Sequence, residues 1–350
     1  MTKKPEYISF TNTNRTLSDA LNIYKQRIKD ALDIYSMFEE EFQLRPCPVC
    51  GKEDYQEIDK FHGTYGIVKC DYCASVFINP CPTMNAIEYY YNNCACNEML
   101  GKVYRKRAVS KSMIVSDRVA YLIEIIKKLL RSKKVGHKLK ILEIGCSSGV
   151  FLSELKKGLL VEGILDLCEL QGIDIDKGAI NKNVDPDINL LTVSVEEFSK
   201  SNSSKFDLVV HFELIEHLLD PYQFMISIHE ILNVSGVHHF HTPNAIGMDN
   251  VVMDWNSTRL LAHGIFPPMH INAFTTQNIV HFSLRSGFRI ITVDTPGKLD
   301  VDIVRLMQDE INEGSHFKEI DTFSDEQLAV IQSWLQTLNA CSHMRVTLEK

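Results

Sequence analysis

The sequence predicts an α/β protein with a doubly wound, mostly parallel sheet, preceded by a helical arm and a small cysteine-rich module. From about residue 138 to residue 296, short apolar runs alternate with amphipathic helical patterns, as in parallel strands joined by crossover helices. Upstream of this core, two Cys-x2-Cys pairs follow a stretch with helical periodicity. A chain of 350 residues has room for two or three such units.

Composition excludes several classes of protein. With 45% apolar and 23% charged residues, the chain resembles an ordinary protein with a packed core. It contains no run of about 18 apolar residues without a charge, so we expect no membrane span. The start, Met-Thr-Lys-Lys-Pro-Glu, lacks the apolar segment of a secretion signal, so we expect the ten cysteines to be thiols or metal ligands in the reducing cytoplasm. The net charge of −8 disfavours nucleic acid, whose phosphates need a positively charged partner.

Residues 1–44 predict a helical arm. Ser18 is a candidate N-cap, and apolar side chains recur at spacings of three and four residues: Leu21, Tyr24, Ile28, Leu32, Tyr35 and Phe38. We expect this stripe to pack on the body of the protein or on a second subunit, and the second alternative would give a homodimer. A docking helix without chemistry of its own is the simplest interpretation.

Residues 45–97 predict a zinc-binding module. Its motif is C-x2-C-x19-C-x2-C, formed by Cys47, Cys50, Cys70 and Cys73. Two knuckles that each present two thiolates complete a closed tetrahedral zinc site, and four sulfur ligands leave no open position for catalysis. We therefore expect a structural Zn2+ ion. Four unrelated reduced cysteines are the alternative, and Cys94 with Cys96 forms a rival pair at an unusual spacing.

Residues 98–350 predict the main domain. An amphipathic helix over 105–134 connects it to the cysteine module. The apolar runs predict seven strands: 140–144, 170–174, 190–193, 207–211, 236–241, 288–293 and 343–348. Helices are expected between them: 149–157, 177–182, 221–232 and 275–286. A capping box at Ser324 opens a last helix, so that 322–350 holds this helix and a final edge strand.

The first strand of the core runs into a glycine turn, Glu143-Ile-Gly-Cys-Ser-Ser-Gly149. Glycines let a ligand approach the backbone, and the helix that follows offers free amides. The spacing is not that of the G-x-G-x-x-G dinucleotide motif, and no G-x-x-x-x-G-K-[ST] motif occurs. The turn therefore favours a nucleoside whose other end is an amino acid. Asp174, at the end of the next strand, is placed to accept ribose hydroxyls, whereas Asp176 is expected to cap a helix.

Four blocks of the core resemble the class I S-adenosylmethionine-dependent methyltransferases in order and spacing: the glycine turn, Gly172-Ile-Asp174, the run from Phe206-Asp to Glu216-His217-Leu-Leu-Asp220-Pro, and Thr242-Pro-Asn244. The resemblance covers roughly 138–296 and is nearest to ubiquinone-type O-methyltransferases and to sugar methyltransferases of glycan and polysaccharide pathways. Several sugar C-methyltransferases also carry an N-terminal zinc module. The resemblance implies a Rossmann-like methyltransferase fold with a seven-stranded sheet and S-adenosylmethionine as cofactor.

The resemblance also implies roles for cofactor-binding residues: Glu143 and Gly145 near the methionyl part with Cys146 and Gly149 in the same turn, Asp174 on the ribose, Glu196 or its neighbours at the adenine, and Phe212 beside the methionyl amine. Ser147 stands where the family has its second glycine. We expect binding to be retained if the dihedral angles of Ser147 are ordinary. For Glu196, a solvated helix start is the alternative.

An acceptor hydroxyl or activated C–H benefits from a positioned base, and side chains that follow the fourth and fifth strands lie where ligands bind in this fold. The candidates in this part of the sequence are Glu213, His217, His241 and His270, with His263 in the connection. His217 is the first candidate, oriented by Glu216 or Glu213, and a structural histidine is the alternative. Residues 245–274, which include Trp255, Arg259, Phe266, Pro267 and Pro268, predict a lid over the acceptor.

The predicted function is methyl transfer from S-adenosylmethionine to a carbohydrate, either a nucleotide-activated sugar or a glycan precursor. Residues 102–140 contain 13 basic and two acidic residues. Such a run predicts a solvated helix face or a phosphate-bearing acceptor, and it keeps RNA as an alternative acceptor. A non-catalytic interaction protein with a degenerate core is a further alternative, supported by Ser147.

Overall fold

The computed structural model describes residues 17–106, 108–132, 137–253, 264–307 and 317–350, without the side chains of 101–113 and a few others. Trp255, Arg259 and His263 lie outside the described residues. No helix within the described ranges has the length and apolar character needed to cross a membrane.

A seven-stranded sheet forms the centre of the molecule, with the order β10-β11-β8-β7-β4-β5-β6. Its strands are: β4 (Leu139–Ile144), β5 (Cys168–Asp174), β6 (Asn189–Thr192), β7 (Phe206–Phe212), β8 (Leu232–Pro243), β10 (Arg289–Asp294) and β11 (His343–Glu349). Five neighbouring strands run parallel, and β11 is antiparallel to both β8 and β10. This confirms the predicted fold class and the seven strands. The strand order reverses between β4 and β7, which is where ligands bind in doubly wound sheets.

The last strand differs from the prediction in its position. The sequence predicted an edge strand over 343–348, but β11 is inserted between β8 and β10, with Val346 opposite Phe240 and Val293. Its inward side chains Met344, Val346 and Leu348 are fully buried. The edge on this side is β10. Sequence periodicity gives a strand's type but not its neighbours, so it could not place β11.

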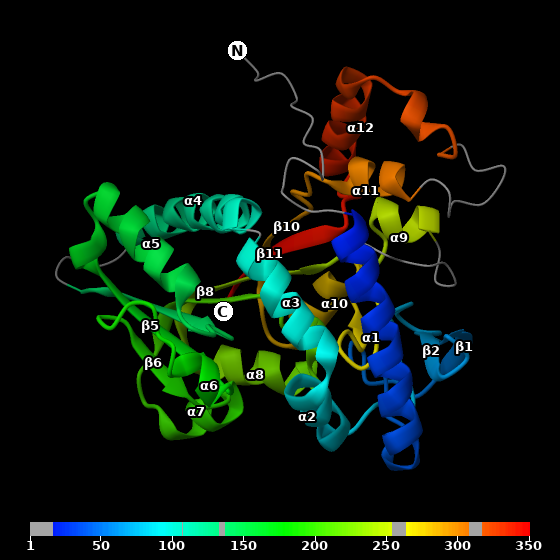
Figure 1. The fold of residues 1–350 in the computed structure, drawn as a ribbon. Helices are drawn as coiled ribbons and strands as arrows, with labels where there is room; N and C mark the ends of the chain where they lie inside the picture. Colours follow the sequence, from blue (N-terminus) through cyan, green and yellow to red (C-terminus); the bar gives the residue numbers. More distant parts are fainter. Residues whose placement is uncertain (1–16, 107, 133–136, 254–263, 308–316) are drawn as a thin grey trace.

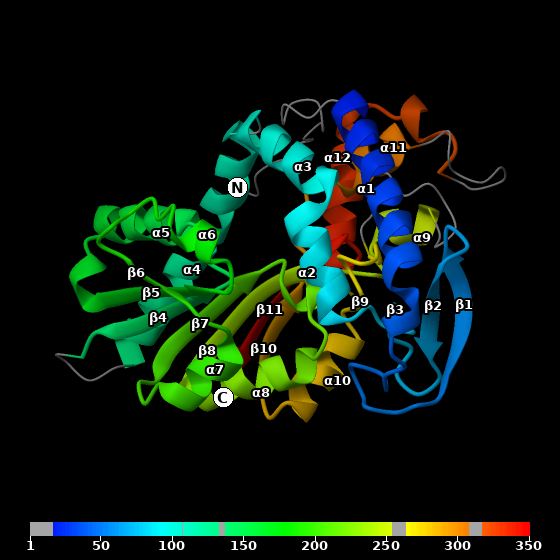
Figure 2. The same ribbon diagram turned by 60° about the horizontal axis from the view of Figure 1, so that its bottom comes forward.

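Helices cover both faces of the sheet (Figures 1 and 2). One face carries α4 (Ala108–Ser132) and α5 (Val150–Val161), whose apolar side chains pack on β4, β7 and β8. The other face carries α7 (Val195–Ser201), α8 (Pro221–Ile231) and α10 (Asn278–Arg285). Short helices complete the crossovers: η3 (Leu165–Leu167), α6 (Lys177–Ile180) and η4 (Ile215–His217). The connecting helix predicted over 105–134 buries one side, where Val119, Ile123 and Ile126 of α4 face the sheet.

The cysteine module forms a second sheet of four antiparallel strands, β1 (Tyr55–Phe61), β2 (Tyr65–Cys70), β3 (Val76–Ile78) and β9 (Asn272–Ala273). The fourth strand comes from the segment that the sequence predicted as a lid. Residues 264–274 of that segment are buried and not an open loop. Phe266, for example, packs against Tyr24 and Phe61. Two helices, α2 (Met84–Asn93) and α3 (Ala95–Lys106), lead from the module to α4.

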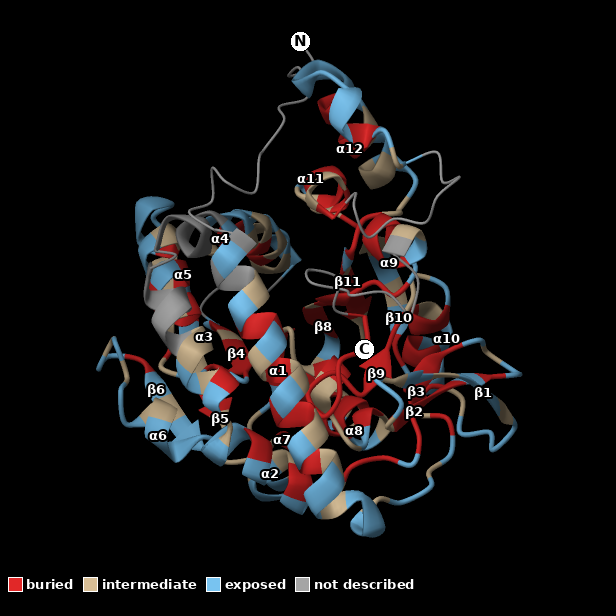
Figure 3. Cartoon of the chain, turned by 45° about the vertical axis from the view of Figure 1, so that its right-hand side comes forward, coloured by how far each residue is buried: buried red, intermediate tan, exposed pale blue. Residues whose placement is uncertain are grey.

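The N-terminal arm is described as α1 (Leu17–Phe38), followed by η2 (Glu39–Glu41). Ser18 lies inside this helix and is not its N-cap. The arm packs on the body of the protein, because Tyr24 and Ala31 are buried and Tyr65 Oη donates a hydrogen bond to the Ala31 carbonyl at 2.8 Å. Figure 3 shows the buried stripe along α1. The C-terminal part of the chain and one earlier helix form a helical cap: α9 (Met248–Met253), α11 (Asp300–Leu306), η6 (Ile320–Thr322) and α12 (Asp325–Thr337). The last of these helices, α12, opens with the predicted capping box at Ser324.

Candidate active site

The glycine turn joins the end of β4 to the start of α5. Gly145 and Gly149 have φ angles of 72° and 76°, in the left-handed region that favours glycine. Ser147 has a φ of 50°, so its dihedral angles are not the ordinary ones expected from the sequence. It adopts the left-handed conformation of the glycine that it replaces, at a cost of about 1 kcal/mol. The turn is held in place because the Ser147 amide donates to Asp174 Oδ2 at 2.7 Å.

Asp174 lies at the end of β5, half-buried beside this turn. Its Oδ1 accepts a hydrogen bond from the Asp176 amide at 2.8 Å. Asp176 caps α6 by accepting from the Ala179 amide, as predicted. Glu196 is half-buried in the first turn of α7, close to β5 because the Val193 amide donates to the Asp174 carbonyl at 3.0 Å. The glycine turn, Asp174 and the Glu196 segment therefore line one edge of the sheet.

Cys146 takes a different place from the rest of the turn. Its thiol is 4% exposed and packs in a small apolar cluster with Leu152 and Ile188. The space beside Gly172 is filled by this sulfur. Only the backbone of Cys146 is therefore available to a ligand.

Glu143 and Arg118 form the polar centre of the next part of this edge. Glu143 is 5% exposed, and its Oε2 has no hydrogen-bond partner among the described residues. Burial raises the pKa of this carboxyl to about 8, although Arg118 acts in the opposite direction. The Arg118 guanidinium lies 4.4 Å from the centroid of the Phe212 ring. A buried carboxylate without a partner is costly, so this position is suited to a bound cation.

Glu213 is tied into an ion-pair network. Its Oε1 is 2.7 Å from Arg118 Nη2, and its Oε2 is 3.5 Å from His343 Nε2. Burial would raise the pKa of Glu213, but His343 and Arg118 hold it down to about 2. Burial would lower the pKa of His343, but Glu213 raises it to about 9. Glu213 is therefore an ionised partner of two cations, which makes it a poor proton acceptor near neutral pH.

His217 lies at the end of η4, over the edge formed by β7 and β8. Its Nδ1 is 3.0 Å from the Met269 carbonyl oxygen, which fixes Nδ1 as the donor and leaves Nε2 unprotonated in the neutral ring. Tyr91 Oη of α2 lies 3.3 Å from the same Nδ1. The His217 and His270 rings are 4.7 Å apart, edge to face. Burial lowers the pKa of His217 to about 4, so the ring is neutral at pH 7.

Glu216 lies directly beside this ring. It is 1% exposed, its Oε2 accepts from Thr242 Oγ1 at 2.9 Å, and its Oε1 is 3.9 Å from His217 Nε2. Burial, followed by the nearby Glu213, raises the pKa of Glu216 to about 8. Ligand atoms of Glu216, His217 and His270 lie within 4.8 Å of one another, a spacing that a metal ion could also use. These groups can therefore accept a proton or bind a cation.

His241 is placed apart from this trio in the described contacts. Its ring lies 5.2 Å from the ring of Phe212, and burial lowers its pKa well below 6.5. The structure thus brings His217 and His270 together, with Glu213 close to both of them, and places His241 beside Phe212.

The four cysteines of the N-terminal motif converge on one point. The Sγ atoms of Cys47 and Cys73 are 3.5 Å apart, as are those of Cys50 and Cys70, and all four lie within 4.8 Å of one another. Sulfurs on a tetrahedral zinc ion, each about 2.3 Å from the metal, lie roughly 3.8 Å apart. Ser75 Oγ is 2.9 Å from Cys47 Sγ. The donor set and its spacing fit the predicted structural zinc.

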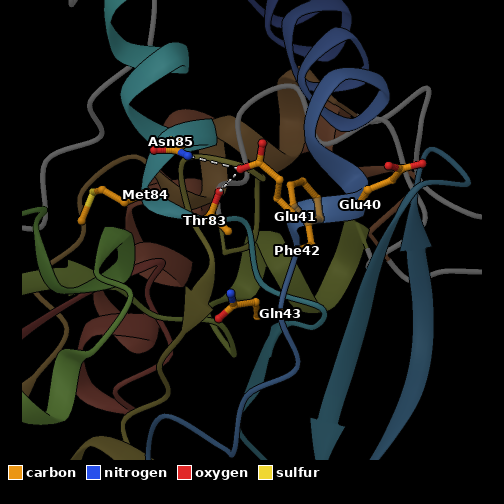
Figure 4. Close-up of a pocket in the computed structure, with 7 residues that line it drawn as sticks. All are labelled: Glu40, Glu41, Phe42, Gln43, Thr83, Met84 and Asn85. Atoms are coloured by element: carbon orange, nitrogen blue, oxygen red, sulfur yellow. Dashed lines mark hydrogen bonds between the residues drawn. The ribbon is translucent and has the colours of Figure 1, made fainter.

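Sequence reasoning missed three residues of the site: Arg118, Tyr91 and His343. Arg118 belongs to the basic run, which was interpreted as a solvated face, and its position between apolar Val115 and Leu122 was the available signal. Tyr91 and His343 reach the site from other units of the chain, and nothing local in the sequence indicates this. A surface pocket lies elsewhere, between η2 and the start of α2 (Figure 4). It is lined by none of the predicted site residues.

Comparison with known proteins assigns the family. The sequence model of a family described as "Methyltransferase domain" matches residues 114–293, which is more than half of the chain. The chain belongs to this methyltransferase family. The match includes the glycine turn, Asp174 and the Glu216–His217 segment, and it confirms the resemblance to class I S-adenosylmethionine-dependent methyltransferases that the sequence blocks indicated.

Curated relatives of the methyltransferase are similar over a shorter stretch. A ubiquinone biosynthesis O-methyltransferase from Histophilus somni is 28% identical over 116 residues, which are 30% of this chain and 45% of that protein. Another from Alkalilimnicola ehrlichii is 30% identical over 88 residues, 23% of this chain and 32% of that protein. The chain thus matches less than half the length of these relatives.

Solved structures of two other methyltransferases are also similar to this chain. An S-adenosylmethionine-dependent methyltransferase from Archaeoglobus fulgidus is 19% identical with a TM-score of 0.43, covering 67% of this chain and 94% of that one. The plantazolicin methyltransferase BamL is 14% identical with a TM-score of 0.47, covering 75% of this chain and 93% of that one.

Proposed function

We propose that this methyltransferase transfers the methyl group of S-adenosylmethionine to a hydroxyl of a carbohydrate, either a nucleotide-activated sugar or a glycan precursor. The observation that carries the cofactor assignment is the buried, partnerless Oε2 of Glu143 beside Arg118. An amino-acid ammonium would supply the missing cation, and the guanidinium would receive the carboxylate of the same amino acid. A zwitterionic methionyl group therefore fits the two side chains together.

The remaining cofactor contacts follow the edge of the sheet. Gly145 and Gly149 let the ligand approach the backbone, Asp174 would accept the ribose hydroxyls, and Glu196 would contact the adenine. When bound, S-adenosylmethionine would supply a methyl group on a sulfonium centre that the acceptor oxygen displaces in line. Phe212 packs beside Arg118 and would cover the methionyl end.

The acceptor half is built around His217. Its unprotonated Nε2 would take the proton that the acceptor hydroxyl loses, and the Glu216 carboxylate at 3.9 Å would stabilise the resulting imidazolium. His270 and Tyr91 flank the ring and would contact the acceptor. Thr242 holds Glu216 in place.

Two kinds of observation support the choice of acceptor. The curated relatives are named O-methyltransferases, which favours a hydroxyl. A four-cysteine module ahead of the core is the feature shared with the sugar methyltransferases that the sequence resembles. RNA is less well supported, because Lys127 of the basic run is paired with Glu124 and Glu162. We place the reaction in the cytoplasm because none of the ten cysteines, all of which lie in the described residues, forms a disulfide.

Ser147 is the argument for a degenerate, non-catalytic core. Its dihedral angles are not the ordinary ones on which retained binding was expected to depend, but the turn is intact, which weakens this alternative. It adopts the left-handed turn of the family's glycine and still donates its amide to Asp174. A bound nucleoside product in freshly purified protein, identified by mass spectrometry as S-adenosylhomocysteine or its methylated parent, would favour the enzyme.

The acceptor is tested by a screen with tritiated S-adenosylmethionine. The arms are a panel of nucleotide sugars, a polyprenyl-linked glycan precursor, a catechol as mimic of a quinol ring, and total RNA. Label transfer to a sugar nucleotide or glycan is expected. Transfer to the catechol or to RNA alone would replace the carbohydrate with that acceptor and leave the methyltransferase assignment intact.

The Asp174→Ala substitution tests the cofactor site. Loss of a charge-assisted contact to the ribose is expected to cost about 1.5–3 kcal/mol, which corresponds to roughly tenfold or more in dissociation constant. Calorimetric titration with S-adenosylhomocysteine measures it, and circular dichroism checks that the variant is folded. Asp176→Ala is the matched control, because Asp176 caps α6 and has no predicted ligand role. Equal affinities for the Asp174 variant and the unmodified protein would show that the nucleoside binds elsewhere.

A further inference from the structure

The segment that carries His217 is attached to the cysteine module by hydrogen bonds that run through residues 269–273 and Arg45. The module's β3 pairs with β9, so that Phe77 lies opposite Asn272 and Val76 opposite Ala273. The Ile78 amide also donates to the Ile271 carbonyl at 3.0 Å. Residues 269–273 therefore belong structurally to the sheet of the cysteine module, although the sequence places them within the methyltransferase domain.

The same short segment holds η4 from the other side. Asn272 is 1% exposed, and its Nδ2 donates to the Leu218 carbonyl at 2.7 Å, with the Ile215 and Glu216 carbonyls at 3.5 and 3.4 Å. The Ile271 amide donates to the Glu216 carbonyl at 3.1 Å. The Met269 carbonyl receives Nδ1 of His217. The position of the His217 ring thus depends on residues 269–272.

The Arg45 side chain connects the cysteine module to residues 271–272 and to the end of the segment that carries His217. It lies two residues before Cys47, and its Nη2 donates to the Ile271 carbonyl at 3.0 Å and to Asn272 Oδ1 at 2.9 Å. Its Nη1 donates to the Leu219 carbonyl at 3.1 Å, directly after η4. Asn79 anchors the backbone of Arg45 through hydrogen bonds to both its amide and its carbonyl. One guanidinium therefore joins the first knuckle, β9 and the loop that carries His217 (residues 213–219), called the His217 loop below.

The glycine turn has none of these connections. Among the described residues, its backbone hydrogen bonds beyond the turn and α5 are with Ile173, Asp174 and Val184, which belong to the main sheet and its crossovers; Leu214 packs beside Gly145 without a hydrogen bond. The two halves of the site are therefore held by different structures.

We propose that Arg45 is a positioning residue through which the cysteine module sets the His217 loop, and with it the acceptor half of the site, independently of the cofactor half. The name "acceptor half" rests on the proposed function, but the structural coupling does not. A guanidinium with planar, forked donors suits a junction of several carbonyl oxygens, and a lysine would reach only part of them.

Hydrogen–deuterium exchange of the zinc-loaded full chain tests this proposal. In Arg45→Ala, faster exchange is expected in peptides that contain residues 213–219 and 269–273, including the Ile271 amide, with unchanged exchange at 143–149. Arg45→Lys should restore part of the protection. Arg285→Ala is the matched control: Arg285 also joins the module to the core, by donating to the Val49 carbonyl at 2.9 Å and stacking on Tyr222, but it has no described contact with the His217 loop.

A second variant keeps the test decisive if Arg45→Ala loses zinc or fails to fold. Asn272→Asp retains an acceptor for Arg45 but removes the donor to the Leu218 carbonyl. It should deprotect residues 213–219 with a full equivalent of zinc, measured by elemental analysis.

Steady-state kinetics with the acceptor found in the screen give an independent readout. A displacement of about 1 Å costs up to roughly 100-fold in rate, so Arg45→Ala should lower kcat by about tenfold to 100-fold, with the KM for S-adenosylmethionine within about twofold. Arg285→Ala should leave both within about threefold.

Unchanged exchange at 213–219 in both Arg45→Ala and Asn272→Asp would overturn the proposal, as would equal loss of protection at 143–149. Failure of the unmodified protein to bind S-adenosylhomocysteine would instead overturn the proposed function, and the exchange experiment would still decide the role of Arg45.

Discussion

The imidazole of His217 combines a fixed tautomer with a low affinity for protons. The Met269 carbonyl receives Nδ1–H, and burial lowers the pKa of the ring to about 4. Such a base is unprotonated at neutral pH but weak, so it needs a partner that stabilises the imidazolium. Glu216 is in place for this, but its own pKa is raised to about 8, so that at pH 7 most of it carries a proton. Ionised Glu216 is therefore expected to be required for proton transfer.

His217→Ala is expected to lower kcat by about 10²–10⁴-fold while the dissociation constant for S-adenosylhomocysteine changes little, because a general base contributes an amount of this order. His217→Asn separates a base from a structural histidine, since an amide can replace the hydrogen bond to Met269 but cannot accept the proton. The pH profile of kcat should rise with pH and level off above about 8, as Glu216 ionises. Glu216→Gln should remove this rise of kcat with pH. Retention of more than about a tenth of the activity by the Asn variant would make His217 a scaffold residue and move the search to His241 or His270.

Among the secondary-structure elements, those defined by local pattern were predictable from the sequence. The strands around the glycine turn, the helix after Asp220-Pro221 and the capping box at Ser324 depend on short-range periodicity and on caps that a few residues encode. The two-residue strand β9 was not predictable. It is too short for any periodicity, and it exists because β3 and Arg45 supply its hydrogen-bond partners from about 200 residues away in the chain. The same limit explains why Arg118, Tyr91 and His343 were missed.

The cysteine module predicts one bound metal ion. Its first knuckle lies before β1, and its second lies at the junction of β2 and β3. One zinc ion per chain is expected, held by Cys47, Cys50, Cys70 and Cys73. In Cys47→Ser, a full equivalent should no longer be bound, because the closed site needs all four thiolates. Elemental analysis of freshly purified protein measures this, with Cys94→Ser as the matched control outside the motif. Less than half an equivalent in the unmodified protein, with no further loss in Cys47→Ser, would mean that the four thiols are merely neighbours.

Two neighbouring strands of the central sheet, β7 and β8, carry buried histidine side chains. His211, His238 and His239 are fully buried, and His241 follows on the same strand as the last two. His211 stacks on Phe240, and neither of its ring nitrogens has a described hydrogen-bond partner. His239 Nδ1 lies 3.0 Å from Thr347 Oγ1, whereas the rings of His211 and His238, without a hydrogen-bond partner among the described residues, act as flat apolar groups in the centre of β7 and β8. They can do so only in the neutral form, because an imidazolium in this place would be an unpaired buried charge.

The stability of the protein should therefore depend steeply on pH. Burial lowers the pKa of His238 to about 3 and those of His211, His239 and His241 well below 6.5, so the folded state stays unprotonated where the unfolded chain binds protons. The contribution of these four histidines is then fully present above about pH 6.5 and is lost as the pH falls, by roughly 1.4 kcal/mol per pH unit for each histidine.

Urea unfolding at pH 7.5, 6.5 and 5.5 measures this loss, and the step from 6.5 to 5.5 should be the larger one. Glu143 and Glu216 act in the opposite sense, because burial raises their pKa values to about 8 and the folded state holds their protons where the unfolded chain has lost them, so they offset part of the acid effect. The contribution of His343, whose pKa is raised to about 9, is lost as the pH rises from about 6.5 toward that value. In His238→Phe, which keeps a flat ring against Phe240, the slope should decrease by about one proton. The same pH dependence in His238→Phe as in the unmodified protein would show that this ring is hydrated or paired in solution, because only then could the folded state take up its proton together with the unfolded chain.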